Sequence, residues 1–113
     1  MSNMKLLSHN LKNLSDGITL KHKNFIVDVV NDGCLRMAVN EENVYGWHSH
    51  PNSDELFVVL EGELVVEFKE HSSLTLRPGD TLTVPKGLIH RTITKTRTVN
   101  LCFESMNSET VFL

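Results

Sequence analysis

After roughly its first twenty residues, the chain is a series of short apolar runs separated by residues that favour turns. Several runs alternate apolar and polar positions, as residues 34–39 do, and this alternation is the period of a β-strand. We count roughly nine strands of about four to seven residues, which favours an antiparallel sandwich or barrel. The predicted strands are residues 25–30, 34–39, 44–50, 55–60, 64–68, 73–76, 81–84, 88–94 and 98–103.

Two local features complete this all-β prediction. The turn at Glu61-Gly62 favours a hairpin between residues 55–60 and 64–68. Helical spacing occurs only at residues 6–14, and this segment is short and has no recognisable cap. We therefore expect no stable helix there.

The length and composition are those of an ordinary globular protein. The chain has 113 residues, 40% of them hydrophobic and 22% charged, so we expect one domain over residues 1–113. A net charge of −3 without basic runs argues against nucleic-acid and membrane partners. The N-terminus lacks the apolar centre of a signal peptide, and no segment is long enough to cross a bilayer. We therefore expect a cytoplasmic protein, whose small core would gain from dimerisation.

The two cysteines, Cys34 and Cys102, lie far apart in apolar, strand-like runs. We interpret them as buried thiols in a reducing cytoplasm. A disulfide, or a thiol beside a metal, remains an alternative that spacing does not decide.

Histidine and glutamate side chains are spaced as a metal site requires. His48 and His50 are two residues apart, so on a strand they project from the same face. The turn at residues 51–54 can fold the chain back so that Glu55 faces the same interior, and His90 arrives from a different strand. Three imidazoles and one carboxylate suit one divalent ion per chain: Mn, Fe, Co, Ni, Cu or Zn. They would leave one or two coordination positions open for water, dioxygen or substrate.

Each of these signals also has a structural interpretation. Among six histidines, one His-x-His pair arises easily by chance, and a lone His90 is more often a hydrogen-bonded core residue than a ligand. The other histidines lie in polar or turn-like segments, and we expect them to be exposed. They are His9, His22 and His71.

Residues 46–62 resemble the first conserved motif of the cupin family, with His48, His50, Glu55 and Gly62 at the family's intervals. The second motif is matched by the residues Gly79, Pro85, Gly87 and His90, whereas its last position, an asparagine in the family, is Thr94 here. That asparagine is not a metal ligand in cupins. The departure therefore concerns local packing rather than the metal.

The resemblance is closest to small one-domain bacterial cupins, often labelled mannose-6-phosphate isomerase-like. It implies a double-stranded β-helix, or jelly-roll, barrel with a core of about residues 24–104 and with His48, His50, Glu55 and His90 as metal ligands. It also implies a homodimer, commonly with exchange of an N-terminal strand, for which residues 25–30 are the candidates.

These features support two classes of function. The leading hypothesis is a metal-dependent enzyme of dioxygenase, isomerase or lyase type, acting on a small molecule in a pocket shaped by residues such as Phe57 and Phe103. The alternative is a non-catalytic cupin that binds a small molecule or a sugar. A metal-free sugar isomerase or epimerase is disfavoured by the complete ligand set. No residue is assigned a catalytic role.

Three further side chains allow more than one interpretation. We interpret Arg36 as a solvent-facing charge, with an anion anchor inside the barrel as the alternative. Arg91 has the opposite parity to His90 and should point away from the metal. Trp47 should also face outward, where a dimer interface is its expected partner.

Overall fold

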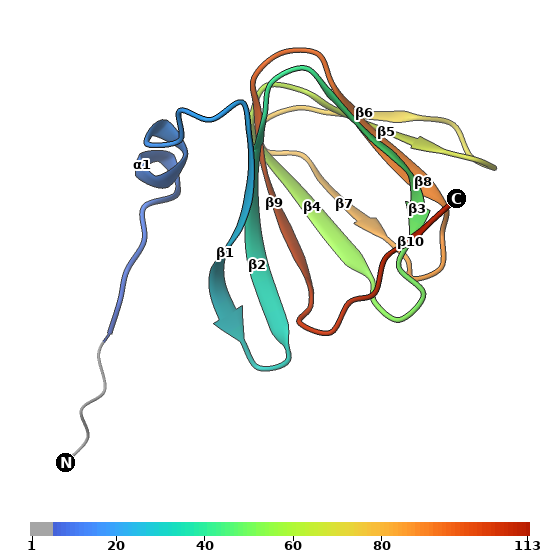
Figure 1. Ribbon diagram of the computed structural model, residues 1–113, viewed down its shortest axis with the longest axis horizontal. Helices are drawn as coiled ribbons and strands as arrows, with labels where there is room; N and C mark the ends of the chain where they lie inside the picture. The colour runs from blue at the N-terminus through green and yellow to red at the C-terminus, as the bar shows by residue number, and fades with distance from the viewer. Residues whose placement is uncertain (1–5) are drawn as a thin grey trace.

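The described residues, 6–113 of the computed structural model, form two antiparallel sheets that face one another (Figure 1). One sheet has the strand order β1-β2-β9-β4-β7, and the other has the order β10-β3-β8-β5-β6. This is the double-stranded β-helix that the cupin resemblance implies. The strands are β1 (His22–Val30), β2 (Gly33–Asn40), β3 (Asn43–Ser49), β4 (Glu55–Glu61), β5 (Leu64–Phe68), β6 (Leu74–Leu76), β7 (Thr81–Val84), β8 (His90–Thr94), β9 (Thr98–Ser105) and β10 (Val111–Phe112).

Alternation along the central strands places one apolar layer between the sheets. On β4, Phe57 and Val59 are buried in this layer, as are Leu64 and Val66 on β5. Leu76, Val84 and Cys102 complete the buried cluster.

The expected hairpin between β4 and β5 is wrong. β4 pairs with β7 and β9, whereas β5 pairs with β6 and β8, so the turn at Gly62 carries the chain from one sheet to the other. Gly62 has a φ of 78°, a conformation that glycine adopts without a steric penalty. A turn signal predicts a reversal of the chain but does not say which sheet the next strand joins.

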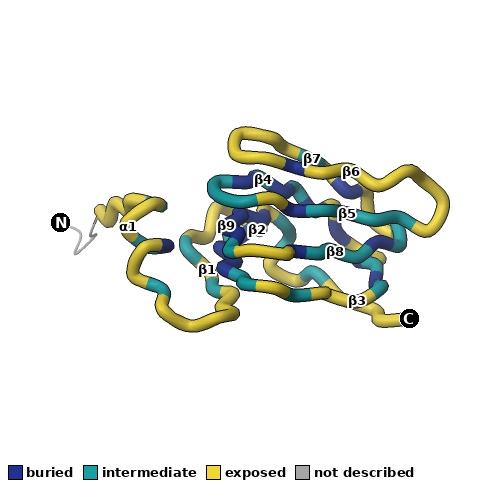
Figure 2. Tube along the Cα trace, turned by 90° about the horizontal axis from the view of Figure 1, so that it is seen from above, coloured by how far each residue is buried: buried dark blue, intermediate teal, exposed yellow. Residues whose placement is uncertain are grey.

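The expectation of no helix near the N-terminus is also wrong. The helix α1 (Leu11–Asp16) is capped by Asn10, whose side chain accepts a hydrogen bond from the backbone N–H of Asn13 at 2.9 Å. Leu11 and Leu14 pack on the outer face of the first sheet, against a buried cluster of Met37, Val39, Val99 and Leu101. Figure 2 shows α1 beside this sheet, away from the second one. Tertiary packing therefore stabilises a helix that is too short to be stable alone.

Arg97 fastens α1 to the barrel. Its guanidinium donates to the carbonyl of Ser15 at 2.8 Å and lies 3.2 Å from the carboxylate of Glu61. Within residues 6–113, no helix is long and apolar enough to cross a membrane.

Candidate metal centre

The four predicted ligands come from three strands and meet between the two sheets. His48 lies near the end of β3 and His50 directly follows that strand, while His90 begins β8 and is the register partner of His48. Glu55 begins β4 on the facing sheet. All four are buried, and one potential ligand atom from each lies within 4.8 Å of the others.

A local irregularity in β3 helps to aim these side chains. The register between β3 and β8 shifts between Tyr45 and His48. Such a bulge re-aims the side chains that follow it. It also leaves the Gly46 carbonyl positioned to accept from the His48 ring.

Backbone carbonyls hold all three imidazole rings through the same nitrogen. The Nδ1 atoms of His48, His50 and His90 donate to the carbonyls of Gly46, Glu109 and Leu88 at 2.7, 2.9 and 2.8 Å respectively. Because a carbonyl only accepts, each Nδ1 carries the proton and each Nε2 of the neutral ring carries a lone pair. This second-sphere arrangement is the one that orients histidine for a metal.

Two of the Nε2 atoms face the Glu55 carboxylate, an acceptor that offers no proton to their lone pairs. The Nε2 atoms of His50 and His90 lie 3.2 and 3.3 Å from Glu55 Oε1. The His50 nitrogen is buried, yet its direction does not suit a hydrogen bond to that oxygen, and no other described residue offers one. Lone pairs that face a carboxylate repel it unless a cation lies between them or the rings are protonated. The residues present therefore fit a divalent ion.

The local electrostatics favour the ligand forms of His48 and Glu55, whereas they favour the protonated ring of His50 in the absence of a cation. Burial, followed by the nearby imidazoles, lowers the pKa of His48, so this ring is neutral near pH 7. Burial alone would raise the pKa of Glu55, but the adjacent His50 and His90 rings lower it to about 2. The Glu55 carboxylate, 3.2 Å from the ring, is the largest cause that raises the pKa of His50, against the effect of burial.

A cavity of about 440 Å³ opens onto the cluster. His48, His50 and Glu55 line it, whereas His90 is fully buried, with 0% of its surface exposed. Other side chains on the cavity wall are mainly polar. They include Asn24, Arg36, Tyr45, Asn100, Cys102, Glu104 and Thr110, together with apolar Phe57.

Two expectations about the pocket are wrong. Arg36 does not lie on a solvent face: it lines the cavity, where it contacts Asn24 and Glu104. Phe103 does not shape the pocket, because it has the opposite parity to Cys102 and packs over Gly33 on the outer face. Both faces of the first sheet carry apolar residues, so the inner face of β2 and β9 is not evident from the pattern.

The cysteines and the remaining histidines follow the expectations. Cys34 and Cys102 are free and buried, and Cys102 faces the cavity. His9, His22 and His71 are exposed, with His22 at the cavity mouth.

Arg91 and Trp47 occupy the outer surface of the second sheet. The Arg91 guanidinium lies 2.6 Å from the Glu67 carboxylate and stacks 4.6 Å from the centre of the Trp47 ring. Lys69 lies over the same ring at 4.2 Å. These contacts agree with the prediction that Arg91 points away from the metal.

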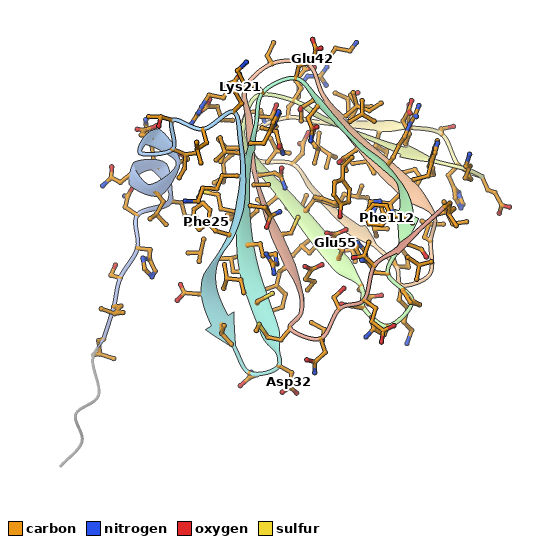
Figure 3. All side chains as sticks on the ribbon, viewed as in Figure 1. Lys21, Phe25, Asp32, Glu42, Glu55 and Phe112 are labelled. Carbon is orange, nitrogen blue, oxygen red and sulfur yellow. The ribbon has the colours of Figure 1, made fainter. Side chains whose placement is uncertain are left out.

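The C-terminal segment contributes to the site without any signal in its sequence. Phe112 on β10 pairs with His48 on β3, and their rings lie 5.7 Å apart. Figure 3 shows Phe112 and Glu55 at the same end of the barrel, and Phe25 on the outer side, towards α1. Glu109 and Thr110, which follow His50 by 59 and 60 residues, both contact its ring.

Comparison with known proteins assigns the family. Residues 35–103 match the Cupin_2 family, described as a cupin domain. The chain belongs to the cupin family.

Related cupins span nearly all of this chain. The uncharacterized protein YdbB of Bacillus subtilis (strain 168) is 48% identical over 104 residues, which cover 92% of this chain and 91% of YdbB. The crystal structure of a cupin-2 domain containing protein from Shewanella frigidimarina is 25% identical, with a TM-score of 0.79, over 86% of this cupin and 93% of that protein. The crystal structure of protein NMB1881 from Neisseria meningitidis is 26% identical, with a TM-score of 0.76, over 88% and 99% of the two chains.

Proposed function

We propose that this cupin binds one divalent transition-metal ion per chain through His48, His50, Glu55 and His90, and acts as a metal-dependent enzyme on a small molecule held in the cavity. One observation carries the proposal. All three Nδ1 atoms are engaged by backbone carbonyls, which turns three Nε2 lone pairs towards one buried carboxylate. The donor set suits Mn, Fe, Co, Ni, Cu or Zn.

The ion would supply Lewis acidity, which polarises an oxygen atom of a bound molecule, or a site for water or dioxygen. The chain's own residues prepare the pocket for this chemistry. The carbonyls of Gly46, Leu88 and Glu109 fix the orientation of the imidazoles, and the Phe57 ring, 6.4 Å from that of His90, excludes water from the inner side. The polar wall of the cavity orients the substrate. Isomerase, lyase and dioxygenase reactions all fit this arrangement.

A second candidate is a non-catalytic cupin that binds a small molecule or a sugar. It is favoured by the state of Glu104, the remaining carboxylate of the cavity. Its side chain lies 3.4 Å from Arg36 and is engaged in an ion pair, while burial raises the pKa of this carboxyl. Turnover of a candidate substrate by the metal-loaded protein separates the two functions.

The deciding experiment measures metal content in purified protein and in a His48→Ala/His50→Ala variant. We expect about one ion per chain in the wild type, and an affinity that is lower by more than about 100-fold in the variant. The circular dichroism spectrum should be retained, since the apolar layer between the sheets does not use these histidines. The matched control is His22→Ala/His71→Ala, which removes two exposed rings and should keep the ion. A wild type that binds none of the six metals after repletion would refute the proposal.

We also propose that residues 1–113 form a single cupin unit and that two copies associate through β1. This strand lies at the edge of its sheet and exposes Ile26, Val29 and Val30 by 41%, 55% and 55%. Exposed apolar side chains on an unpaired strand edge favour pairing with another chain. Light scattering should show a dimer for the wild type and a monomer for Val29→Lys.

A further inference from the structure

Arg36 is a cationic side chain inside the barrel that the metal cluster does not use. It lies on the inner face of β2, where its Nη1 donates to Asn24 Oδ1 at 2.9 Å and its Nε lies 3.4 Å from Glu104 Oε1. A guanidinium has five N–H groups in a planar fork. The two contacts leave further donors for a ligand in the cavity that Arg36 lines.

The sheet places Arg36 within reach of a ligand on the metal cluster. Arg36 is the register partner of Cys102 on β9, and Cys102 is the partner of Phe57 on β4, two residues after Glu55. Since β9 alone separates β2 from β4, their backbones are roughly 10 Å apart. The long arginine side chain covers much of this gap, so a small molecule can contact both the ion and the guanidinium.

The charges in the cavity favour an anion. One basic side chain, Arg36, faces two acidic ones, Glu55 and Glu104. Lys23 also borders the cavity, but its ammonium lies over the ring of Phe25, on the outer face of the sheet. A bound divalent ion adds two positive charges, so the loaded cavity is net positive. Charge pairs inside a partly closed, low-dielectric space interact more strongly than in bulk water.

We infer that this cavity takes a small organic carboxylate, which would bind the ion through a polar group and Arg36 through its carboxylate. This inference rests on the metal proposed above. Glu104 shows that a carboxylate reaches this guanidinium. It is also the cross-strand partner of Glu55, on the same inner face. Glu104 therefore orients Arg36 and competes with the ligand for it.

The test uses calorimetric titration of zinc-loaded protein with acetate, succinate and adipate, three carboxylates that differ in the length of their carbon chain. We expect at least one probe to bind the wild type. Arg36→Gln should weaken that probe about 10- to 100-fold, because it removes a charge-assisted hydrogen bond. Arg36→Lys should lose less affinity for the probe, since lysine keeps the positive charge but not the planar set of N–H donors. Glu104→Gln should bind the probe more tightly, an effect that a damaged fold does not produce.

Arg91→Gln is the matched control, because Arg91 lies on the outer surface and should not affect the probe. Zinc content is measured for every variant. If Arg36→Gln holds zinc and binds the probe as tightly as the wild type, or if no probe binds zinc-loaded wild type with a Kd below about 10 mM, the carboxylate inference is overturned while the metal proposal stands. A wild type that takes up no metal overturns both.

Discussion

Asn52 and Glu109 are 57 positions apart in the chain, and the Asn52 side-chain oxygen accepts the backbone N–H of Glu109 at 2.8 Å. The amide nitrogen of the same side chain donates to the carbonyl of Asn107, also at 2.8 Å. The carbonyl of Glu109 in turn accepts from His50 Nδ1. Asn52 therefore holds residues 107–109 in place, and the carbonyl of Glu109 in this segment orients the ring of His50, a proposed metal ligand.

Removing the two hydrogen bonds of the Asn52 side chain should weaken metal binding, although Asn52 is not itself a proposed ligand. We expect Asn52→Ala to lower metal affinity by about 10- to 100-fold, the usual effect of losing an outer-sphere partner. Asn52→Asp keeps the acceptor for Glu109 and should retain more of the affinity. Competition with a chromophoric chelator measures both variants. Asn13→Ala, at an exposed position of α1, is the control, and an Asn52→Ala variant with wild-type affinity would show that these two hydrogen bonds are not needed.

The metal-free protein should be sensitive to acid through Glu55. The pKa of this carboxyl is lowered from 4.5 to about 2 in the folded state, so its ionised form stabilises the fold above about pH 4.5. That contribution is lost as the pH falls from 4.5 towards 2. We expect a loss on the order of 3 kcal/mol in the free energy of unfolding over this range.

Urea denaturation at several pH values measures this loss. Glu55→Gln should be less stable than the wild type at pH 6 and should approach it near pH 2. Glu70→Gln, at an exposed position, should follow the wild-type curve. Parallel curves for wild type and Glu55→Gln would contradict the assigned role of the carboxylate.

The two thiols should be inert in the folded protein. Burial, with the negative charges of Glu55 and Glu104, raises the pKa of Cys102 well above its usual range, and Cys34 is only 2% exposed. The thiolate is the reactive form, so alkylation by iodoacetamide at pH 8 should be negligible in the native state. Mass spectrometry should find both cysteines modified after unfolding in guanidinium. Rapid modification of native Cys102 would show that its side of the cavity opens to solvent.

Gly62 and Gly79 should respond differently to alanine. Both have positive φ, 78° and 92°, but a Cβ at Gly62 would collide with the Arg97 carbonyl, whereas one at Gly79 meets nothing within 4 Å. We expect Gly62→Ala to lose roughly 2–4 kcal/mol of unfolding free energy, and Gly79→Ala about 1–2 kcal/mol. Equal losses in urea denaturation would mean that the contact with Arg97 relaxes freely.

Local sequence pattern predicted most strands because short-range alternation reports which residues share a face. Parity placed Glu55, Phe57 and Val59 on one face of β4, as the structure has them. The same alternation placed Arg36 and Met37 on opposite faces of β2. It did not show which face is the inner one, because α1 and its neighbours bury the outer face as well.

The features that the pattern missed depend on contacts between distant segments. β10 has two residues, and its partner in β3 lies more than 60 positions earlier. α1 depends on an asparagine cap and on the apolar cluster beneath it. At Gly62 the chain passes close to Arg97 and Thr98, residues that lie more than 30 positions later and so leave no signal in the sequence around the turn.

The position of β10 has a practical consequence for purification. Leu113 follows Phe112 directly and donates its backbone N–H to the Trp47 carbonyl at 3.1 Å, beside the strand that carries His48. A polyhistidine tag fused there would start next to the ligand cluster and bring competing chelating groups to its entrance. A handle without chelating groups, attached ahead of α1, would not be fused beside the ligands, so metal content measured on such protein would report the cupin site alone.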